Sequence, residues 1–329
     1  MSSLAAKPDV FLSAVAGQQT HVGGVFPLVY ECRGGVGDVE AACAWLREGA
    51  DERFCEASRH GAVLFRGFPL RTADDFDHFV TATGLPAFTY EDSLSNAVRM
   101  NRTPRVFTAN EAPPSVSIFF HHEMAQTPHY PAKLFFFCEQ PAETGGATPL
   151  CRSDVLWERL AAECPRFAHD VATKGLQYSH VMPAAADLAS GMGRSWQSTL
   201  KTETAAGAEA RLEVLGYTWQ WLEDGSLRVQ TPVLPGVHQL PDGRRSFFNQ
   251  LIAAYRGWKD ARNDPAKSIT LGDGSPLDSA AVAVAIRLSD ELAFDLPWKT
   301  GDVVLVDNFV AMHGRRPFTG TRKVLAAML

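Results

Sequence analysis

Two histidines and one glutamate are the residues of this sequence with the clearest capacity for metal chemistry. His121 and Glu123 are separated by one residue within the apolar stretch 118–124. If this stretch is a β-strand, His121 and Glu123 lie on one face and His122 on the other, because side chains alternate along a strand. Together with one distant histidine, such a pair forms the 2-His-1-carboxylate arrangement that holds Fe(II) with open coordination positions.

The His-x-Glu motif is weak evidence by itself. With 10 His and 37 Asp+Glu among 329 residues, roughly one His-x-Asp/Glu is expected by chance, and one is found. A core or surface histidine near an unrelated carboxylate is therefore the competing interpretation. The rest of the chain has to decide between the two.

His313 is the candidate for the distant ligand. It lies 192 residues after His121, so only the fold could bring the two together. It follows a predicted strand, 301–308, that ends in the polar pair Asp307-Asn308, a setting typical of a barrel mouth where ligands bind. Two neutral imidazoles and one carboxylate would leave a ferrous site with net positive charge, so an anionic co-ligand is expected.

Arg322 supplies a partner for that co-ligand. The predicted last strand, 322–329, places Arg322 on the same face as Val324, Ala326 and Met328, where a guanidinium is costly to bury unless it meets an anion. The far carboxylate of 2-oxoglutarate fits this role, with the hydroxyl of Thr148 assisting. A surface arginine and an ordinary turn threonine are the alternatives for each residue taken alone.

The elements that must position these residues are mostly extended. Residues 132–138 form a continuous apolar strand with no wet face, and Asp224-Gly225 marks a hairpin. Helical spacing is seen at 39–57, and Thr72 is a predicted N-cap. Strands outnumber helices, which predicts a mainly β protein with flanking α-helices and a double-stranded β-helix (jelly-roll) core. We expect one domain, 1–329, with a lid or insertion at 178–216.

Composition narrows the partners. A net charge of −6 and a pI near 5.9 argue against a nucleic-acid footprint. The apolar runs are shorter than a membrane span needs, and the first residues lack the pattern of a secretory signal. We therefore expect a cytoplasmic protein that acts on a small molecule, with no nucleic-acid or membrane partner. The oligomeric state is left open.

Several motifs together resemble one known family. FHHEMA at 120–125, GGAT at 145–148 and HGRRPF at 313–318, followed by Arg322, are similar to the TauD/TfdA family of Fe(II)/2-oxoglutarate dioxygenases. The His-x-Glu-Met form resembles its clavaminate synthase-like branch most. The resemblance implies that His121, Glu123 and His313 bind iron and that Thr148 and Arg322 bind 2-oxoglutarate, with O2 as the oxidant. His122 matches a position that is not a ligand.

The resemblance also bears on the substrate. It implies a small amino-acid-like compound or natural-product intermediate, free or carrier-bound, whose unactivated C–H bond is hydroxylated, or desaturated or cyclised, with release of succinate and CO2. Arg316 and Arg99 are candidates for binding a substrate carboxylate. Sulfonate-oxidising members carry a second arginine where this chain has Ala326, and halogenases lack the carboxylate ligand that Glu123 supplies.

Four other interpretations compete with this one. A zinc nucleobase deaminase needs a later Pro-Cys-x-x-Cys, and a zincin needs His-Glu-x-x-His; the sequence has neither. Catabolic oxidation of a sulfonate or aryloxy acid is the alternative enzymatic function. A jelly-roll binding module without turnover is the alternative of another class, since motif retention does not prove activity.

Overall fold

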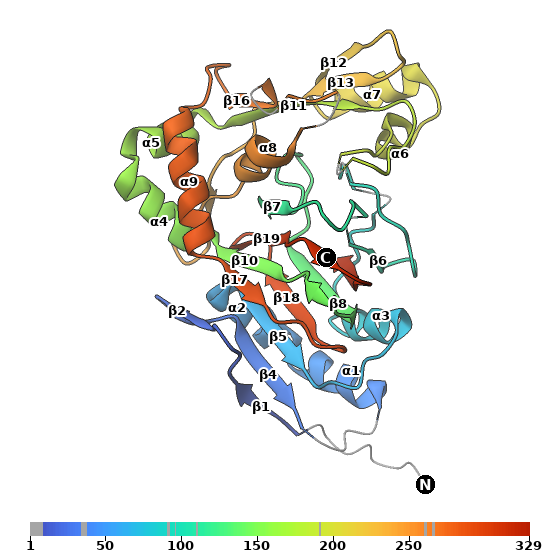
Figure 1. Cartoon of the computed structure of the whole chain (residues 1–329), viewed down its shortest axis with the longest axis vertical. Coiled ribbons are helices and arrows are strands. Elements are labelled where there is room, and N and C mark those ends of the chain that lie inside the picture. Colours follow the sequence, from blue (N-terminus) through green and yellow to red (C-terminus); the bar gives the residue numbers. More distant parts are fainter. Residues whose placement is uncertain are drawn as a thin grey trace.

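Two β-sheets form the centre of the protein (Figure 1). The computed structural model describes residues 9–33, 38–90, 93–95, 97–109, 111–190, 192–259, 262–264 and 267–329. The larger sheet has the order β1 (Val10–Ser13), β4 (Leu28–Cys32), β5 (Ala62–Arg66), β18 (Val303–Asp307), β8 (Lys133–Gln140), β21 (Lys323–Met328) and β6 (Phe107–Thr108). The smaller sheet has the order β17 (Phe294–Leu296), β10 (Thr148–Arg152), β19 (Ala311–Arg315) and β7 (Ile118–His121).

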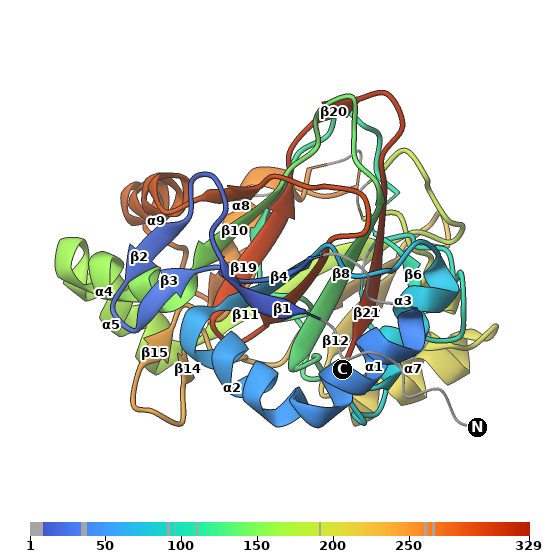
Figure 2. The same cartoon turned by 90° about the horizontal axis from the view of Figure 1, so that it is seen from below.

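The main core lies between these sheets. Leu134, Phe136 and Cys138 of β8 pack in one buried cluster with Leu150 of β10 and Ala311 of β19. Figure 2 shows β8 and β21 on one side of this core and β10 and β19 on the other. The alternate residues of β8, such as Phe135 and Phe137, belong to a second cluster on the outer face of the larger sheet. The predicted strand at 132–138 is thus confirmed. Its sequence is continuously apolar because both faces of the strand are buried.

Helices cover the outer faces of both sheets. The cluster outside the larger sheet includes side chains of α1 (Val39–Glu48), α2 (Ala50–His60) and α3 (Ala73–Thr81). The cluster outside the smaller sheet includes side chains of α4 (Ser153–Glu163), α5 (Pro165–Lys174), α8 (Leu251–Gly257) and α9 (Ser279–Glu291). The prediction of a mainly β protein with flanking helices is confirmed.

The helix predicted over 39–57 is two helices, so this detail of the prediction was wrong. Gly49 ends α1 and also precedes α2, with φ −117° and ψ 18°, outside the helical range. Glycine has the lowest helix propensity after proline, which explains why the break falls there. The predicted N-cap is confirmed, because Thr72 and Asp75 form a reciprocal capping box at the start of α3.

A third sheet lies beside the two central ones, at the top of Figure 1. Its order is β12 (Thr218–Trp221), β13 (Leu227–Gln230), β11 (Leu176–Met182) and β16 (Ile269–Leu271), and α6 (Trp196–Leu200) and α7 (Ala205–Val214) accompany it. Three short pairs complete the strands: β2 (Gln19–His21) with β3 (Gly24–Phe26), β9 (Thr144–Gly145) with β20 (Phe318–Thr319), and β14 (His238–Gln239) with β15 (Arg245–Ser246). The segment 178–216, expected as a lid or insertion, therefore contains most of a strand and two helices.

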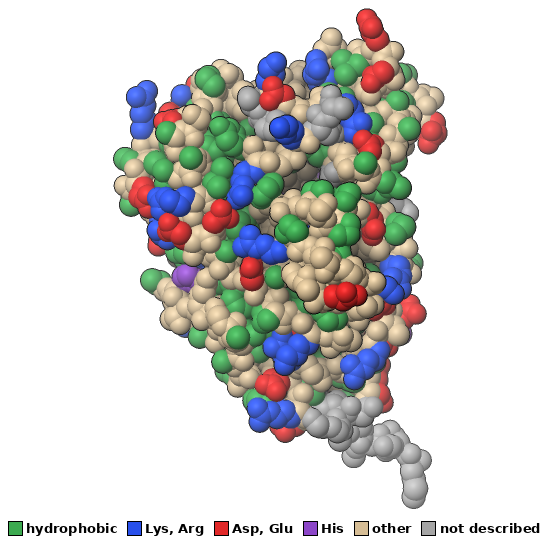
Figure 3. All heavy atoms as spheres, viewed as in Figure 1, with side chains coloured by type: hydrophobic (Ala, Val, Ile, Leu, Met, Phe, Trp, Pro, Cys, Tyr) green, Lys and Arg blue, Asp and Glu red, His purple; other side chains and the backbone are tan. Residues whose placement is uncertain are grey.

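The surface agrees with the composition. On the face drawn in Figure 3, acidic and basic side chains are interspersed, and basic residues do not gather into a stripe. Within the described residues, no helix combines the length and the apolarity needed to cross a membrane.

Candidate metal and 2-oxoglutarate site

Adjacent strands bring the predicted metal ligands together. β7 and β19 pair antiparallel, with His121 opposite His313. The Nε2 atoms of His121 and His313 lie 3.9 and 3.5 Å from Oε2 of Glu123. One ligand atom from each of the three residues falls within 4.8 Å of the others. The expected convergence across 192 residues of sequence is therefore what the fold produces.

Glu123 is positioned differently from the expectation. β7 ends at His121, so Glu123 lies in the following turn, and the prediction that strand alternation orients it was wrong. Asn308, after β18, holds this turn: its Oδ1 accepts from the Glu123 backbone N–H (2.8 Å), and its Nδ2 donates to the carbonyls of Glu123 (3.0 Å) and Pro131 (2.8 Å). Asn308 is fully buried. The sequence placed Asn308 in a polar turn but gave no sign of this contact.

We expect Asn308→Ala to lower the free energy of unfolding by about 3 kcal/mol, because three buried backbone groups lose a hydrogen-bond partner at roughly 1 kcal/mol each. Urea denaturation measures this. The control is Gln239→Ala, which removes an exposed amide bonded to the carbonyl of Gly243 and should change stability by less than about 0.5 kcal/mol. Equal stability of the two variants would contradict the role given to Asn308.

His122 points away from the ligand cluster. Its Nδ1 donates to the carbonyl of Asn308, and its ring packs against Phe248 with centroids 4.8 Å apart. It is fully buried, and burial lowers its pKa to about 3, so the ring is neutral. The expectation that His121 and His122 face opposite ways agrees with this geometry.

This difference predicts opposite outcomes for two neighbouring alanine variants. His121→Ala should lose bound iron, whereas His122→Ala should retain it. Of these two neighbouring histidines, only His121 contributes a nitrogen to the cluster. The iron content per chain after anaerobic reconstitution and desalting is the measurement. Iron loss in His122→Ala with retention in His121→Ala would mean that the strand register is shifted by one residue.

The donor set suits a divalent metal. The Nδ1 of His121 lies 2.8 Å from the carbonyl of Phe119, which holds the proton there and leaves the Nε2 lone pair facing the cluster. Burial, together with His313, lowers the pKa of His121 to about 4, so its imidazole is neutral. Burial opposes ionisation of Glu123, but Arg99 and the two histidines outweigh it and hold its pKa well below the usual range. Two imidazole nitrogens and one carboxylate are the ligand types that ferrous iron takes in such sites.

Arg99 contacts this carboxylate directly. Its Nη2 donates to both oxygens of Glu123, each at 3.0 Å, and both side chains are buried. Arg99 was expected as a substrate-carboxylate partner, whereas the structure pairs it with Glu123. Arg316, the other substrate candidate, is paired with Asp295 at 2.9 Å, with 38% of its side chain exposed, and it is not among the described residues that line the two cavities at the cluster.

A small cavity of about 40 Å³ connects the histidines to the predicted 2-oxoglutarate residues. His121, His313, Thr148 and Arg322 all line it. Arg322 donates from Nε to the carbonyl of Gly146 (2.8 Å) and from Nη2 to Oγ1 of Thr148 (3.1 Å). Burial lowers the pKa of Arg322 to about 10, yet it stays charged at neutral pH, and it has no carboxylate partner among the described residues. A buried guanidinium without an anion is suited to receive one.

Two further residues here were missed by the sequence analysis. The indole Nε1 of Trp298 donates to Oγ1 of Thr148 at 3.0 Å and so fixes the hydroxyl that also accepts from Arg322. Arg315 is buried and donates to the carbonyls of Ala112, Pro113 and Val116, which holds the chain that leads into β7. The spacing of Trp298 and Arg315 in the sequence does not indicate these hydrogen bonds.

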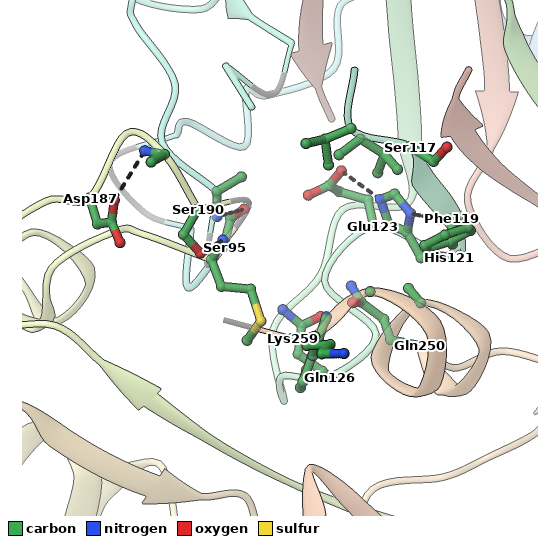
Figure 4. Close-up of a pocket in the computed structure, with 18 residues that line it drawn as sticks. Ser95, Ser117, Phe119, His121, Glu123, Gln126, Asp187, Ser190, Gln250 and Lys259 are labelled. Carbon is green, nitrogen blue, oxygen red and sulfur yellow. Dashed lines mark hydrogen bonds and ion pairs between the residues drawn. The ribbon is translucent and has the colours of Figure 1, made fainter. Parts of the chain in front are cut away.

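A larger cavity, of about 360 Å³, opens from His121 and Glu123 on another side (Figure 4). Phe119, Gln126, Gln250 and Trp258 contribute to its wall. From the segment expected as a lid or insertion, the described lining residues are Asp187, Ala189, Ser190 and Met192. Its volume suits a small molecule of metabolite size. His121 lines both cavities, so a molecule in the larger one lies beside the cluster.

Known proteins are similar to this chain over most of its length. The sequence profile of the family described as "Taurine catabolism dioxygenase TauD, TfdA family" matches residues 36–328. Clavaminate synthase-like protein At3g21360 of Arabidopsis thaliana is 43% identical over 269 residues, covering 82% of this chain and 81% of that protein. Dapdiamide synthesis protein DdaC of Enterobacter agglomerans is 27% identical over 284 residues, covering 83% of each chain.

Solved structures share the fold at low sequence identity. A taurine dioxygenase described as putative and alpha-ketoglutarate-dependent, from Burkholderia xenovorans, superposes with TM-score 0.53 at 13% identity, covering 98% of this chain and 92% of that chain. AAD-2 in complex with Mn(II) and N-oxalylglycine gives TM-score 0.52 at 14% identity, covering 97% and 96%.

Proposed function

Because the chain belongs to the TauD/TfdA family of Fe(II)- and 2-oxoglutarate-dependent dioxygenases, we propose that it oxidises an unactivated C–H bond of a small amino-acid-like or natural-product substrate. The products from 2-oxoglutarate are succinate and CO2. We further propose that the two central sheets form a double-stranded β-helix within a single domain, 1–329. The observation that carries the proposal is that His121, Glu123 and His313 converge within 4.8 Å beside a cavity that Thr148 and Arg322 also line.

In this proposal His121, Glu123 and His313 hold the iron, and Arg322 and Thr148 bind the far carboxylate of 2-oxoglutarate. When bound, the ferrous ion and 2-oxoglutarate would activate O2, which is the oxidant. Asn308 fixes the turn that carries Glu123, and Arg99 keeps the Glu123 carboxylate ionised. Trp298 holds the Thr148 hydroxyl where it faces Arg322. The substrate occupies the larger cavity.

Two positions bear on the reaction and on the substrate. Glu123 occupies the ligand position that must be vacant for chloride to bind, which favours hydroxylation, or desaturation or ring closure, over halogenation. The position of a second, sulfonate-binding arginine is occupied by Ala326, which packs in the core between the sheets. A methyl group there offers a sulfonate no charge, so catabolic sulfonate oxidation is disfavoured.

The test is anaerobic addition of Fe(II) and 2-oxoglutarate to the purified protein. A visible charge-transfer band is expected, because 2-oxoglutarate that chelates iron through its carboxylate and keto oxygen absorbs in this way. The band should require both components and should be lost in Glu123→Ala. Correctly folded protein that shows no band with both components present would contradict the proposed function.

A further inference from the structure

The larger cavity contains a buried carboxamide without a partner. Gln126 lines this cavity three residues after Glu123, and only 3% of the residue is exposed. Its Oε1 is buried and has no hydrogen-bond partner among the described residues. An unsatisfied buried amide oxygen is destabilising, so this side chain is suited to a ligand that donates a hydrogen bond to it.

The neighbouring carboxamide shows the contrast. Gln250 lines the same cavity, but its Nε2 donates to the carbonyl of His122 at 3.2 Å, and its backbone N–H donates to the hydroxyl of Tyr178 at 3.0 Å. Gln250 is therefore anchored by the protein. The carboxamide of Gln126 is therefore available to a bound molecule. Figure 4 shows that both glutamines line the cavity.

The charges that line the cavity favour an anion. Of its two carboxylates, Glu123 is paired with Arg99, and Asp187 is paired with Arg262 at 2.8 Å. Lys259 lines the cavity too, is exposed, and forms no ion pair with a described residue. With both acids already neutralised, the described lining has no carboxylate to receive an ammonium group, whereas the Lys259 ammonium can receive a carboxylate.

We infer that the substrate is a carboxylate whose nitrogen is acylated, of the N-acyl amino acid class, rather than a free amino acid. Its amide group bonds to the carboxamide of Gln126, and its carboxylate faces Lys259. This inference rests on the proposed function, because it assigns the larger cavity to the substrate. It makes Gln126 and Lys259 residues that determine specificity.

Four matched probes test the inference by anaerobic isothermal titration calorimetry of the protein loaded with Fe(II) and 2-oxoglutarate. They are N-acetyl-L-leucine, its methyl ester, L-leucine, and the 2-acetoxy acid in which an ester oxygen replaces the amide N–H. N-acetyl-L-leucine should bind tightest. The acetoxy acid should bind about fivefold to tenfold more weakly, because one hydrogen bond is lost. The methyl ester should bind up to about fivefold more weakly, as an exposed ion pair contributes little.

Variants assign each preference to its residue. Gln126→Met should remove the preference for the amide over the acetoxy acid, and Lys259→Met should remove the preference for the acid over its methyl ester. The control Lys174→Met, at a surface ion pair with Asp170 and Asp273, should leave both preferences unchanged. The same titrations on metal-free protein check that the preferences do not depend on the bound iron.

The inference is overturned if L-leucine binds as tightly as its N-acetyl form, if N-acetyl-L-leucine does not bind at millimolar concentration, or if the preferences persist in the two variants. These failures differ from failure of the proposed function. That failure appears earlier, as absence of the charge-transfer band before any probe is added.

Discussion

Glu123→Ala should abolish oxygen-dependent succinate formation and lower the affinity for Fe(II) by more than about 100-fold. Loss even of a residue that only supports a metal ligand costs 10–100-fold in affinity, and Glu123 is itself the anionic member of the cluster. Succinate release and iron content after anaerobic reconstitution are the measurements. Glu158→Ala, which removes an exposed carboxylate on α4, should match the unaltered protein in both.

The alanine variant also leaves Arg99 buried without its partner, which could destabilise the fold. Glu123→Gln avoids most of this, because it keeps the size and a hydrogen-bond acceptor for Arg99 while removing the charge. It should fold, as judged by near-ultraviolet circular dichroism, and still bind iron poorly. A folded Glu123→Gln protein with undiminished iron affinity would remove Glu123 from the ligand set.

Arg322→Ala should raise the KM for 2-oxoglutarate by about 100-fold or more. Truncating one partner of a buried, hydrogen-bonded charge pair costs 2–5 kcal/mol, and each 1.4 kcal/mol is a factor of ten. Arg322→Lys should recover part of the loss, since lysine restores the charge without the two-point contact that a guanidinium makes. The KM for 2-oxoglutarate and the strength of the charge-transfer complex are the measurements.

Arg316→Ala is the matched control, because Arg316 is an arginine nearby in sequence that is partly exposed and paired with Asp295. Its KM for 2-oxoglutarate should be unchanged. Thr148→Val should have an effect of about fivefold, as it removes a single hydroxyl from the same cavity. If Arg316→Ala and Arg322→Ala raised the KM equally, the small cavity would not be the 2-oxoglutarate site.

The local patterns of the sequence predicted the strands well, because periodicity reports burial directly. The strand at 132–138 is apolar at every position since both faces are covered, and Val324, Ala326 and Met328 share the core face as alternation predicted. Arg322 lies just before β21, yet it still reaches the cavity with Thr148. Alternation alone does not explain this placement, because the register of β21 against β8 shifts between Lys323 and Val324.

Periodicity alone did not predict contacts between distant residues; the pairs His121–His313 and Arg322–Thr148 were expected from the motifs and the family resemblance. The orientation of Glu123 depends on Asn308, 185 residues away, and the partner of Arg99 depends on a loop without periodicity. A single glycine decided whether 39–57 was one helix or two. Such pairings carry no signature in the spacing of one chain, because either partner alone resembles an ordinary turn or surface residue.

The order of the strands in the larger sheet has a consequence for biosynthesis. β8 lies between β18 and β21, both of which are made more than 150 residues after it. During translation its apolar side chains and both hydrogen-bonding edges stay uncovered, a state prone to aggregation. His313 is likewise made late, so the nascent chain cannot complete the metal site until then. We therefore expect folding in cells to depend on chaperones that shield β8 while the ribosome finishes the chain.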